Sequence, residues 1–382
     1  MEVRIHPCGV IGESEVSPVI SPTGNRPGRV KGEEEYMNEQ GVAERIFGLK
    51  DGEGNARWWA GGLATIKATG EETGDLYSIV EVLEPEGTRA PLHLHHKEDE
   101  AFYVLQGEMT FHVGEQTIQA RPGSFVFGPR DVPHAYTVDS GPAKLLFLLS
   151  PPGFEGFIET ISEPAKARTL PPPNGEASQG ENDAADEAGS ASFAVLEARY
   201  GCEIVGPPPE RHSDREQGKE GPMDGNGGRA YGLKQGEGEA RWWLGGLATV
   251  KATGKETGGR YTLVEVLEPE GEQPFHVHHR EDEGFWVLEG ELTFEVGEET
   301  IKASPGSFLL GPKDVPHRYT VESGPAKLLF VLSPAGFEEF VYATSEPAKE
   351  LTLPPQPEGE PSEAEMEQLG AVARQYGCEL LI

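Results

Sequence analysis

The sequence predicts an all-β chain in which one domain, a β-sandwich or a β-barrel, occurs twice. The first observation behind this prediction is internal repetition. The segment GLKDGEGNARWWAGGLATIKATG begins at Gly48 and recurs as GLKQGEGEARWWLGGLATVKATG from Gly232. The segment PGSFVFGPRDVPHAYTVDSGPAKLLFLLSP begins at Pro122 and recurs as PGSFLLGPKDVPHRYTVESGPAKLLFVLSP from Pro305. Because the copies match at roughly 70 percent of positions, the chain is a tandem duplication of a whole domain.

The second observation is a series of short apolar segments within each copy. In the first copy these segments are 76–84, 101–106, 108–113, 116–120, 124–128, 134–138 and 144–150. They are rich in β-branched and aromatic residues and are separated by Gly, Pro and Asp, which is typical of strands and turns. Such spacing predicts a sandwich or barrel and not a helical or doubly wound fold. Gly107 and its twin Gly290 are predicted to form tight hairpin turns with positive φ.

Each copy is predicted to end with a short amphipathic helix. The matching segments are FAVLEARYGCEIVGPPP from Phe193 and MEQLGAVARQYGCELLI from Met366. In the second copy Ser362 and Glu365 have the spacing of a capping box, and Gly377 ends the helix. Apolar residues recur at helical spacing at Met366, Leu369, Val372 and Tyr376.

Segments rich in Pro, Gly, Ser, Asp and Glu separate these elements and suggest the domain boundaries. The prediction is a flexible N-terminal tail at 1–44, a first domain at 45–205 with its barrel at about 56–160, a linker at 206–229, and a second domain at 230–382 with its barrel at about 240–343. Residues 171–191 are predicted to form a loop before the first closing helix. Single barrels expose sheet edges and apolar surface that commonly pair, so the two domains are expected to form an intramolecular pseudo-dimer.

Composition excludes several classes of partner. The formal net charge of −33 disfavours nucleic acids and anionic lipid surfaces. No window of about 18 apolar residues predicts a membrane span, and the first residues do not resemble a signal peptide. The three cysteines, Cys8, Cys202 and Cys378, provide no disulfide framework and favour a reducing compartment. We therefore expect a cytoplasmic protein, in which Cys202 and Cys378 are small buried residues in packed turns.

One polar cluster in each copy predicts a metal site. His93 and His95 lie two positions apart in an extended segment, so their side chains leave the same face. Glu100 shares parity with Phe102 and Val104 in the next strand, which places its carboxylate on the expected inner face. An imidazole pair facing a carboxylate inside a barrel is costly to bury unless a divalent metal neutralises and orients the three groups.

His134 is the fourth candidate ligand, because Pro133 stiffens the approach to it and an extended segment follows. The four candidates recur with identical internal spacing as His276, His278, Glu283 and His317. The other histidines of the first copy and the tails, His6, His112 and His212, have no histidine counterpart. Repetition therefore sets the four candidate ligands of each domain apart from His6, His112 and His212, and a purely structural polar cluster is the alternative.

These residues carry a resemblance to a known family. The pattern Gly87-x5-His93-x-His95-x4-Glu100-x6-Gly107 resembles the first cupin motif, and PGSFVFGPRDVPHAYTV resembles the second. The resemblance covers both repeats, about two thirds of the chain. It implies a bicupin, with two tandem cupin (double-stranded β-helix, or jelly-roll) barrels that each end in a short helix. It also implies one divalent transition metal per domain, held by three His and one Glu.

Two departures from the family pattern concern the loops around the site. Gly271 precedes His276 with one residue fewer between them than in the first copy, which alters the loop that enters the second site. Val138 and Val321 stand four residues beyond the motif-two histidines, where the family often has Asn. Neither departure affects a candidate ligand. The wider sequence, including WWLGGLATVKATG and the closing YG helix, resembles bacterial quercetin-dioxygenase-like cupins.

The other polar and aromatic residues near the motif receive structural interpretations. His96 and His279 are expected in loops, with direct ligation or orientation of a ligand as the alternative. Four carboxylates are expected in a solvated turn: Glu98, Asp99, Glu281 and Asp282. The tryptophan pairs 58–59 and 242–243 are expected to pack between the barrel and a partner surface, with stacking on an aromatic substrate as the alternative.

The resemblance and the ligand set together imply a function. Such a site leaves open positions on an octahedral metal, and its N and O ligands do not select sharply among Fe, Ni, Mn, Co, Cu and Zn. The favoured hypothesis is a dioxygenase acting on a flavonol-like or hydroxy-ketone small-molecule substrate, with dioxygen as co-substrate and Glu100 or Glu283 as the catalytic base. The alternatives are another cupin enzyme, a decarboxylase or isomerase, and a non-catalytic cupin that binds metal or a small ligand.

Overall fold

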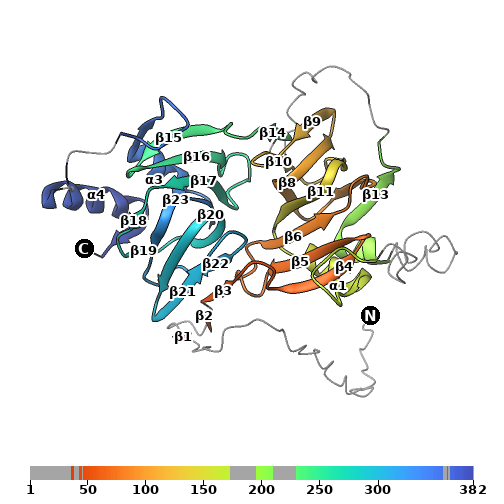
Figure 1. Cartoon of the computed structure of the whole chain (residues 1–382), viewed down its shortest axis with the longest axis horizontal. Helices are drawn as coiled ribbons and strands as arrows, with labels where there is room; N and C mark the ends of the chain where they lie inside the picture. Colours follow the sequence, from red (N-terminus) through yellow and green to blue (C-terminus); the bar gives the residue numbers. More distant parts are fainter. Residues whose placement is uncertain are drawn as a thin grey trace, which may run out of the picture.

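The predicted all-β fold of two barrels is confirmed by the structure, a computed structural model (Figure 1). The structure describes residues 36–37, 43–44, 46–172, 195–209, 229–355, 359 and 362–381. His6, Cys8 and His212 lie outside these residues, as does most of the predicted loop at 171–191 and of the predicted linker at 206–229. Within the predicted tail, β1 (Tyr36–Met37) and β2 (Ala43–Glu44) pair antiparallel.

The two halves contain equivalent elements in the same order, except that the second half has one additional short strand, β18. The first half has β4 (Asn55–Trp59), β5 (Gly62–Ala68), β6 (Ser78–Glu84), β7 (Leu92–His95), β8 (Asp99–Val113), β9 (Gln116–Ala120), β10 (Phe125–Gly128), β11 (His134–Ser150), α1 (Phe154–Ile161), β12 (Glu163–Pro164), a helix at 195–200 and β13 (Cys202–Gly206). The second half has β15 (Glu239–Trp243), β16 (Gly246–Ala252), β17 (Thr262–Glu268), β18 (Gly271–Glu272), β19 (His276–His278), β20 (Asp282–Val296), β21 (Glu299–Ala303), β22 (Phe308–Gly311), β23 (His317–Ser333), α3 (Phe337–Ala343), β24 (Ser345–Pro347), α4 (Glu363–Gln375) and β25 (Cys378–Leu380).

The long strands β8 and β11 form the centre of the first barrel, and β20 and β23 form that of the second. The prediction of a hairpin turn at Gly107 is wrong, because β8 runs through this residue without turning. Its φ of 84° agrees with the predicted positive value. The extra residues lie opposite, in β11, where a bulge brings the backbone so close that a Cβ on Gly107 would lie 2.8 Å from Ala143 Cα. Glycine is required here for close approach of two strands.

The closing helix of the second half has the predicted start. Ser362 Oγ accepts a hydrogen bond from the Glu365 backbone N–H, and the Glu365 carboxylate accepts one from the Ser362 N–H. Leu369, Val372 and Tyr376 pack against the second barrel core. The short helices α1 and α3 were not predicted from the sequence. They follow β11 and β23 directly, and their apolar side chains help to close the barrels.

The buried apolar side chains form three hydrophobic clusters, and neighbouring residues of the long strands belong to different clusters. One fills each barrel, and Phe102 and its twin Phe285 belong to these interiors. A third cluster lies between the barrels and combines residues of both halves, including Tyr103, Trp286 and Phe308. Because neighbouring residues in a strand face opposite sides, β8 and β20 each supply one barrel interior and the shared interface. The interface therefore has a hydrophobic core of its own, consistent with two barrels paired within one chain.

Each repeat also donates a strand to the other barrel. β3 (Phe47–Leu49), at the start of the first repeat, pairs with β22 of the second. β14 (Tyr231–Leu233), at the start of the second repeat, pairs with β10 of the first. Figure 1 shows both strands at the edge of the opposite barrel. This reciprocal exchange covers one sheet edge of each barrel and ties the two halves together.

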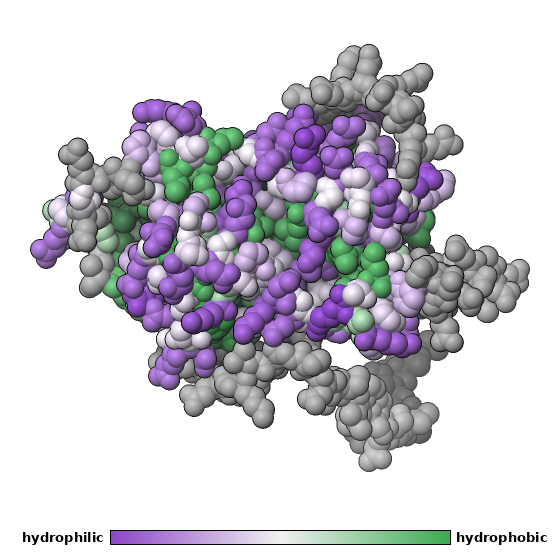
Figure 2. Space-filling view, in the orientation of Figure 1, coloured by the Kyte–Doolittle hydropathy of each residue, from purple (hydrophilic) through white to green (hydrophobic). Residues whose placement is uncertain are grey.

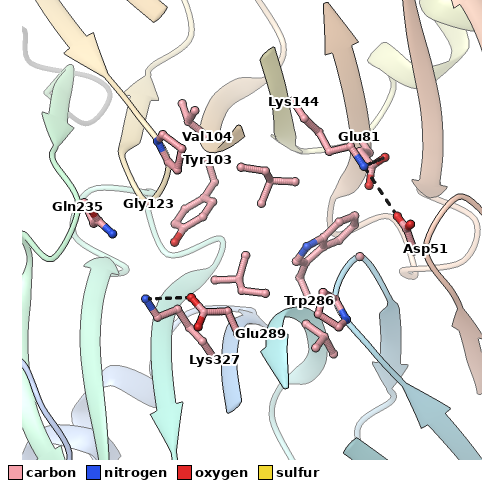
Figure 3. Close-up of a pocket in the computed structure, with 16 residues that line it drawn as sticks. Asp51, Glu81, Tyr103, Val104, Gly123, Lys144, Gln235, Trp286, Glu289 and Lys327 are labelled. Atoms are coloured by element: carbon pink, nitrogen blue, oxygen red, sulfur yellow. Dashed lines mark ion pairs between the residues drawn. The ribbon is translucent and has the colours of Figure 1, made fainter. Parts of the chain in front are cut away.

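A cleft of about 330 Å³ remains between the barrels, and Figure 3 shows Tyr103 and Trp286 entering it from opposite halves. Its charged groups are paired: Lys144 Nζ lies 3.1 Å from the Glu81 carboxylate. The Tyr103 hydroxyl donates a 2.5 Å hydrogen bond to Glu265, from β17 of the other half. The hydrogen bond from Tyr103 to Glu265 thus joins the two barrels beside the apolar interface cluster.

The face seen in Figure 2 carries many hydrophilic residues, with apolar patches on both barrels and between them. This distribution agrees with the net charge of −33. Among the described residues, none of the helices is long and apolar enough to cross a membrane.

Candidate metal centres

The four candidate ligands of each half come from three adjacent strands. β7 carries His93 and His95, Glu100 follows the first residue of β8, and His134 begins β11. β7 pairs with β11 so that His93 stands directly opposite His134. Because His93 and His95 share parity, both rings leave the same face of β7. The sheet therefore brings together residues that are about forty positions apart in sequence.

The ligand atoms of the first cluster are close enough to share one ion. One nitrogen or oxygen atom from each of the four side chains lies within 4.8 Å of all the others. The Glu100 Oε2 atom is 3.2 Å from His95 Nε2 and 3.0 Å from His134 Nε2. Both His95 and Glu100 are about 1% exposed. Sequence parity thus correctly predicted which side chains of the motif converge.

The second cluster repeats this geometry. The Glu283 Oε2 atom lies 3.1 Å from His278 Nε2, 3.2 Å from His317 Nε2 and 3.8 Å from His276 Nε2. The four ligand atoms again lie within 4.8 Å of one another. The shorter loop before His276 therefore leaves the cluster intact.

Backbone carbonyls orient the rings for metal binding. His93 Nδ1 lies 2.8 Å from the Pro91 carbonyl oxygen, and His134 Nδ1 lies 3.0 Å from that of Val132. A carbonyl oxygen only accepts, so each Nδ1 carries a proton and, with a metal bound, each Nε2 would present its lone pair to the ion. His276 and His317 have the equivalent contacts. The loop carbonyls thus favour the tautomer that a histidine needs to bind a metal through Nε2.

The prediction that the four neighbouring carboxylates form a solvated turn is wrong. Glu98, Asp99 and Glu281 are at most 2% exposed, and Asp282 is partly buried. Glu98 Oε2 lies 3.7 Å from His95 Nδ1, and Glu281 has the same relation to His278. β8 begins at Asp99, so this part of the motif is already strand. Glu98 and Glu281 therefore lie behind one ligand ring in each centre, as carboxylates behind metal-binding histidines often do.

His96 and His279 point away from the clusters, in agreement with their expected loop position. His96 Nδ1 lies 2.6 Å from Asp131, and its Nε2 lies 3.1 Å from Glu203 of β13. His279 makes the equivalent contacts. Hydrogen bonds to these carboxylates raise the pKa of His96. Its role is to connect the loop before β8 with the closing strand.

Charge is distributed unevenly within the metal-free cluster. Burial lowers the pKa of His93 to about 3, and the charges of the neighbouring His134 and His95 act in the same direction. Burial also opposes charge on His95, but Glu100 and Glu98 outweigh it and raise its pKa to about 9. Burial would raise the pKa of Glu100, but His95 and His134 hold it below its usual range. The metal-free centre is therefore an imidazolium–carboxylate pair beside a neutral imidazole.

We expect metal binding to release protons at neutral pH. His95 and His278, each with a pKa of about 9, carry a proton at pH 7 that a metal must displace. About one proton should leave per bound ion, and affinity should rise about tenfold per pH unit up to about pH 9 and then level off. Calorimetric titration in two buffers of different ionisation enthalpy measures this release, and an absence of proton release at pH 7 would contradict the expectation.

Each cluster opens on a cavity whose wall includes several aromatic side chains. The first cavity is about 150 Å³ and includes Trp59, Phe147, Phe154 and Phe157 in its wall. The second is about 60 Å³ and includes the equivalent Trp243, Phe330, Phe337 and Phe340. The second tryptophan of each pair thus packs on the barrel core and also forms cavity wall, while Trp58 Nε1 donates to the Thr169 carbonyl.

The structure adds cavity residues that the sequence analysis did not identify. The hydroxyl of Tyr136 donates a 3.2 Å hydrogen bond to Glu84 in the first cavity. The hydroxyl of Tyr319 donates one of the same length to Glu268 in the second. Burial raises the pKa of Glu268 to about 8, although the Tyr319 hydrogen bond lowers it. The only signal in the sequence was that both pairs recur at equivalent positions.

The two closing cysteines also line the cavities. Cys202 and Cys378 are buried as expected, but they lie in β13 and β25 and not in turns. Cys202 stands opposite His95 in the β7–β13 pair. Burial, reinforced by nearby glutamates, raises the pKa of both thiols to about 12. They are thus neutral wall residues at physiological pH.

The donor set of each cluster fits a divalent transition metal. Three imidazole nitrogens and one carboxylate oxygen suit Fe, Ni, Mn, Co, Cu and Zn, and the cavity side leaves coordination positions for a further ligand. The ring nitrogens of the buried His95 contact only carboxylates of the described residues, Glu100 at Nε2 and Glu98 at Nδ1, and a metal at Nε2 would take the place of the proton shared with Glu100. Each half therefore contains one His/Glu metal-binding cluster.

Comparison with known proteins agrees with this architecture. The Cupin domain model matches residues 79–149 and 263–332, which include both clusters. Quercetin 2,3-dioxygenase of Bacillus subtilis (strain 168) is 27% identical over 311 residues, which cover 81% of this chain and 89% of that protein.

Solved structures of oxalate decarboxylase from Bacillus subtilis share the fold. One, determined at pH 4.6, has a TM-score of 0.51 and 16% identity over 77% of each chain. Another, from work on the Mn(II) centres of that enzyme, has a TM-score of 0.51 and 15% identity over 77% of this chain and 78% of that one. At such identity the likeness concerns the fold alone. With two segments that match the Cupin domain model, two paired barrels and one His/Glu cluster in each barrel, this chain contains two tandem cupin domains.

Proposed function

We propose that the chain is a metal-dependent dioxygenase that acts on a flavonol-like or hydroxy-ketone substrate. The observation that carries this proposal is a three-His, one-Glu cluster at the base of an aromatic-lined cavity in each barrel. The similarity to a quercetin 2,3-dioxygenase over most of both chains supports the choice of reaction. Two sets of ligands are proposed: His93, His95, Glu100 and His134, and His276, His278, Glu283 and His317.

The metal, when bound, would supply a Lewis acid that holds an oxygen atom of the substrate. The protein would supply the base. Glu100 is buried in the cluster, and its carboxylate is the group of the described ligand set that would accept the hydroxyl proton of the substrate. Loss of that proton makes the substrate an electron-rich enolate, the form that reacts with dioxygen. Glu283 would have the same role in the second barrel.

The cavity walls would orient the substrate and exclude water. Trp59, Phe147 and Phe154 pack edge to face at the first site, so they offer rigid apolar surface to a planar ring. Exclusion of water strengthens the electrostatic interactions of the base and the metal.

The scarcity of cysteines, two of them buried thiols, supports a cytoplasmic location.

Oxygen uptake by the metal-loaded chain tests this proposal. Incubation with a panel of flavonols and diketones should consume dioxygen, and Glu100→Gln together with Glu283→Gln should lower the rate by about 100-fold or more because the base is lost. Elemental analysis of the same variants separates loss of the base from loss of metal. Turnover of a small carboxylate or sugar without dioxygen would indicate a decarboxylase or isomerase, and no turnover of any compound would indicate a binding protein.

A further inference from the structure

We propose that the cleft between the barrels binds one small, uncharged aromatic molecule that bears a hydroxyl group. The cleft has a volume of about 330 Å³ and is lined by residues of both halves. Ligand sites in proteins commonly have volumes of about 300–1,000 Å³. The described residues that line this cleft include none of the eight proposed metal ligands. The site thus lies outside the two metal centres, and its occupation does not depend on the proposed reaction.

The strands β8 and β20 place the cleft and the metal clusters on opposite faces. Phe102 and Phe285 lie in the barrel interiors, whereas the next residues, Tyr103 and Trp286, belong to the interface cluster. This change of side follows from the alternation of side chains along a strand. Figure 3 shows Tyr103 and Trp286 at the cleft, one from each half. Their rings offer apolar surface against which a planar aromatic ligand can pack.

The duplication identifies a polar contact that one half makes and the other lacks. The Tyr103 hydroxyl donates a 2.5 Å hydrogen bond to Glu265 Oε2. By their positions in the repeats, Glu81 is equivalent to Glu265, and Trp286 is equivalent to Tyr103. An indole ring has no hydroxyl group, so the equivalent hydroxyl bond to Glu81 cannot form.

Glu81 is therefore a buried acceptor with unused capacity. It is 6% exposed and forms part of the cleft wall. Glu81 Oε1 lies 3.1 Å from Lys144 Nζ, but no donor among the described residues lies within hydrogen-bond distance of Oε2. Lys67 Nζ is 3.9 Å from this oxygen. Buried polar atoms are usually hydrogen-bonded, and a ligand hydroxyl would supply for Glu81 the bond that Tyr103 supplies for Glu265.

The ion pairs around the cleft favour a ligand without charge. A charged ligand would lose its hydration there without meeting a free counter-charge. A neutral hydroxyaromatic molecule needs only apolar surface, aromatic rings and one acceptor, and the wall offers all three. The pairs balance, with four lysines and four carboxylates: Lys67, Lys144, Lys251 and Lys327, and Asp51, Glu81, Glu265 and Glu289.

Binding of 2-naphthol to the full, metal-free chain tests the proposal. 2-Methoxynaphthalene has the same rings but no O–H donor, and removal of metal prevents either compound from binding to an ion. Isothermal titration calorimetry should show one 2-naphthol per chain, bound about tenfold or more tighter than 2-methoxynaphthalene, because only the first can donate to a carboxylate. Equal affinities, or no binding of 2-naphthol, would overturn the proposal.

Two variants of the cleft wall locate the bound molecule. Trp286→Tyr gives the first half the residue of the second, and its hydroxyl should bond to Glu81 and lower the affinity for 2-naphthol to about that of 2-methoxynaphthalene. Gln235→Trp fills the cleft from an exposed wall position and should weaken both compounds about tenfold or more. Gln119→Trp is the matched control, since Gln119 is exposed and does not line the cleft. It should keep the original affinity.

Circular dichroism first shows that each variant is folded, and Gln235→Trp decides the outcome if Trp286→Tyr does not fold. Unchanged binding of 2-naphthol in the folded cleft variants would place the molecule elsewhere, such as in the barrel cavities, and would refute the site. The measurement needs neither metal nor turnover. A chain that consumes no dioxygen can therefore still bind 2-naphthol in the cleft, and failure of this proposal is distinguishable from failure of the proposed function.

Discussion

Replacing His93 with alanine is expected to lower the metal content of the purified chain by about half. The substitution removes one of four ligands from the first cluster, and no other described side chain offers a ligand atom within the same 4.8 Å group. The second cluster lies in the other barrel and keeps all its ligands. His276→Ala should therefore remove the other half, and elemental analysis of both variants measures the effect.

His112→Ala is the matched control for this experiment. His112 is in the same barrel, near the end of β8, and its side chain contacts Thr117 of β9 and not the metal cluster. Its twin is Glu295, so the position does not recur as histidine. Full metal content is expected in this variant. Loss of all metal from either His93→Ala or His276→Ala would show that the two centres do not bind independently.

Asp99→Ala is expected to lower the free energy of unfolding by about 3 kcal/mol. Asp99 is fully buried and accepts hydrogen bonds from the backbone N–H and the side chain of Arg130, and it pairs with Arg260 of the other half. Its removal leaves two guanidinium groups without their shared carboxylate, although both are about one quarter exposed, which limits the cost. Urea denaturation of the metal-free chain measures the change, since bound metal would add its own stabilisation.

The equivalent change in the second half provides the control. Asp282 accepts a 2.7 Å hydrogen bond from the Lys313 backbone N–H, but the position equivalent to Arg260 is the apolar Leu76. Asp282→Ala should therefore cost about 1 kcal/mol, the usual cost of one lost hydrogen bond. Equal costs for the two substitutions would show that the ion pair between the barrels does not contribute to stability.

Several features of the site could be predicted from the sequence because they depend on local geometry. Strand parity placed His93, His95 and Glu100 on the inner faces of their strands and set His96 aside, and repetition favoured His134 and its twin over His112, which does not recur. The capping box at Ser362 was also confirmed, since the side-chain contacts of a helix start span only three residues. In each case the interaction follows from spacing within one element or from the duplication.

Other features depended on contacts that no local pattern contains. A polar run such as KEDE is typical of a turn, yet the carboxylates are buried, because Asp99 meets an arginine from the other barrel and Glu98 lies behind a ligand ring. Gly107 has the positive φ of a turn residue, but its strand continues, since the extra residues are accommodated in the partner strand. The exchange of β3 and β14 could not be predicted either, because a three-residue apolar segment does not indicate which barrel it will pair with.

By itself, the sequence determined that this protein consists of two copies of a β-barrel domain and that each carries three histidines and a glutamate at metal-binding spacing. The tertiary structure alone decided how the copies join, which carboxylates lie behind the ligands and how much space each metal centre leaves for a substrate. The physical reason is the range of the interactions. Periodicity and spacing act within a strand, whereas burial, ion pairing between barrels and cavity volume depend on side chains that meet only after distant strands have packed.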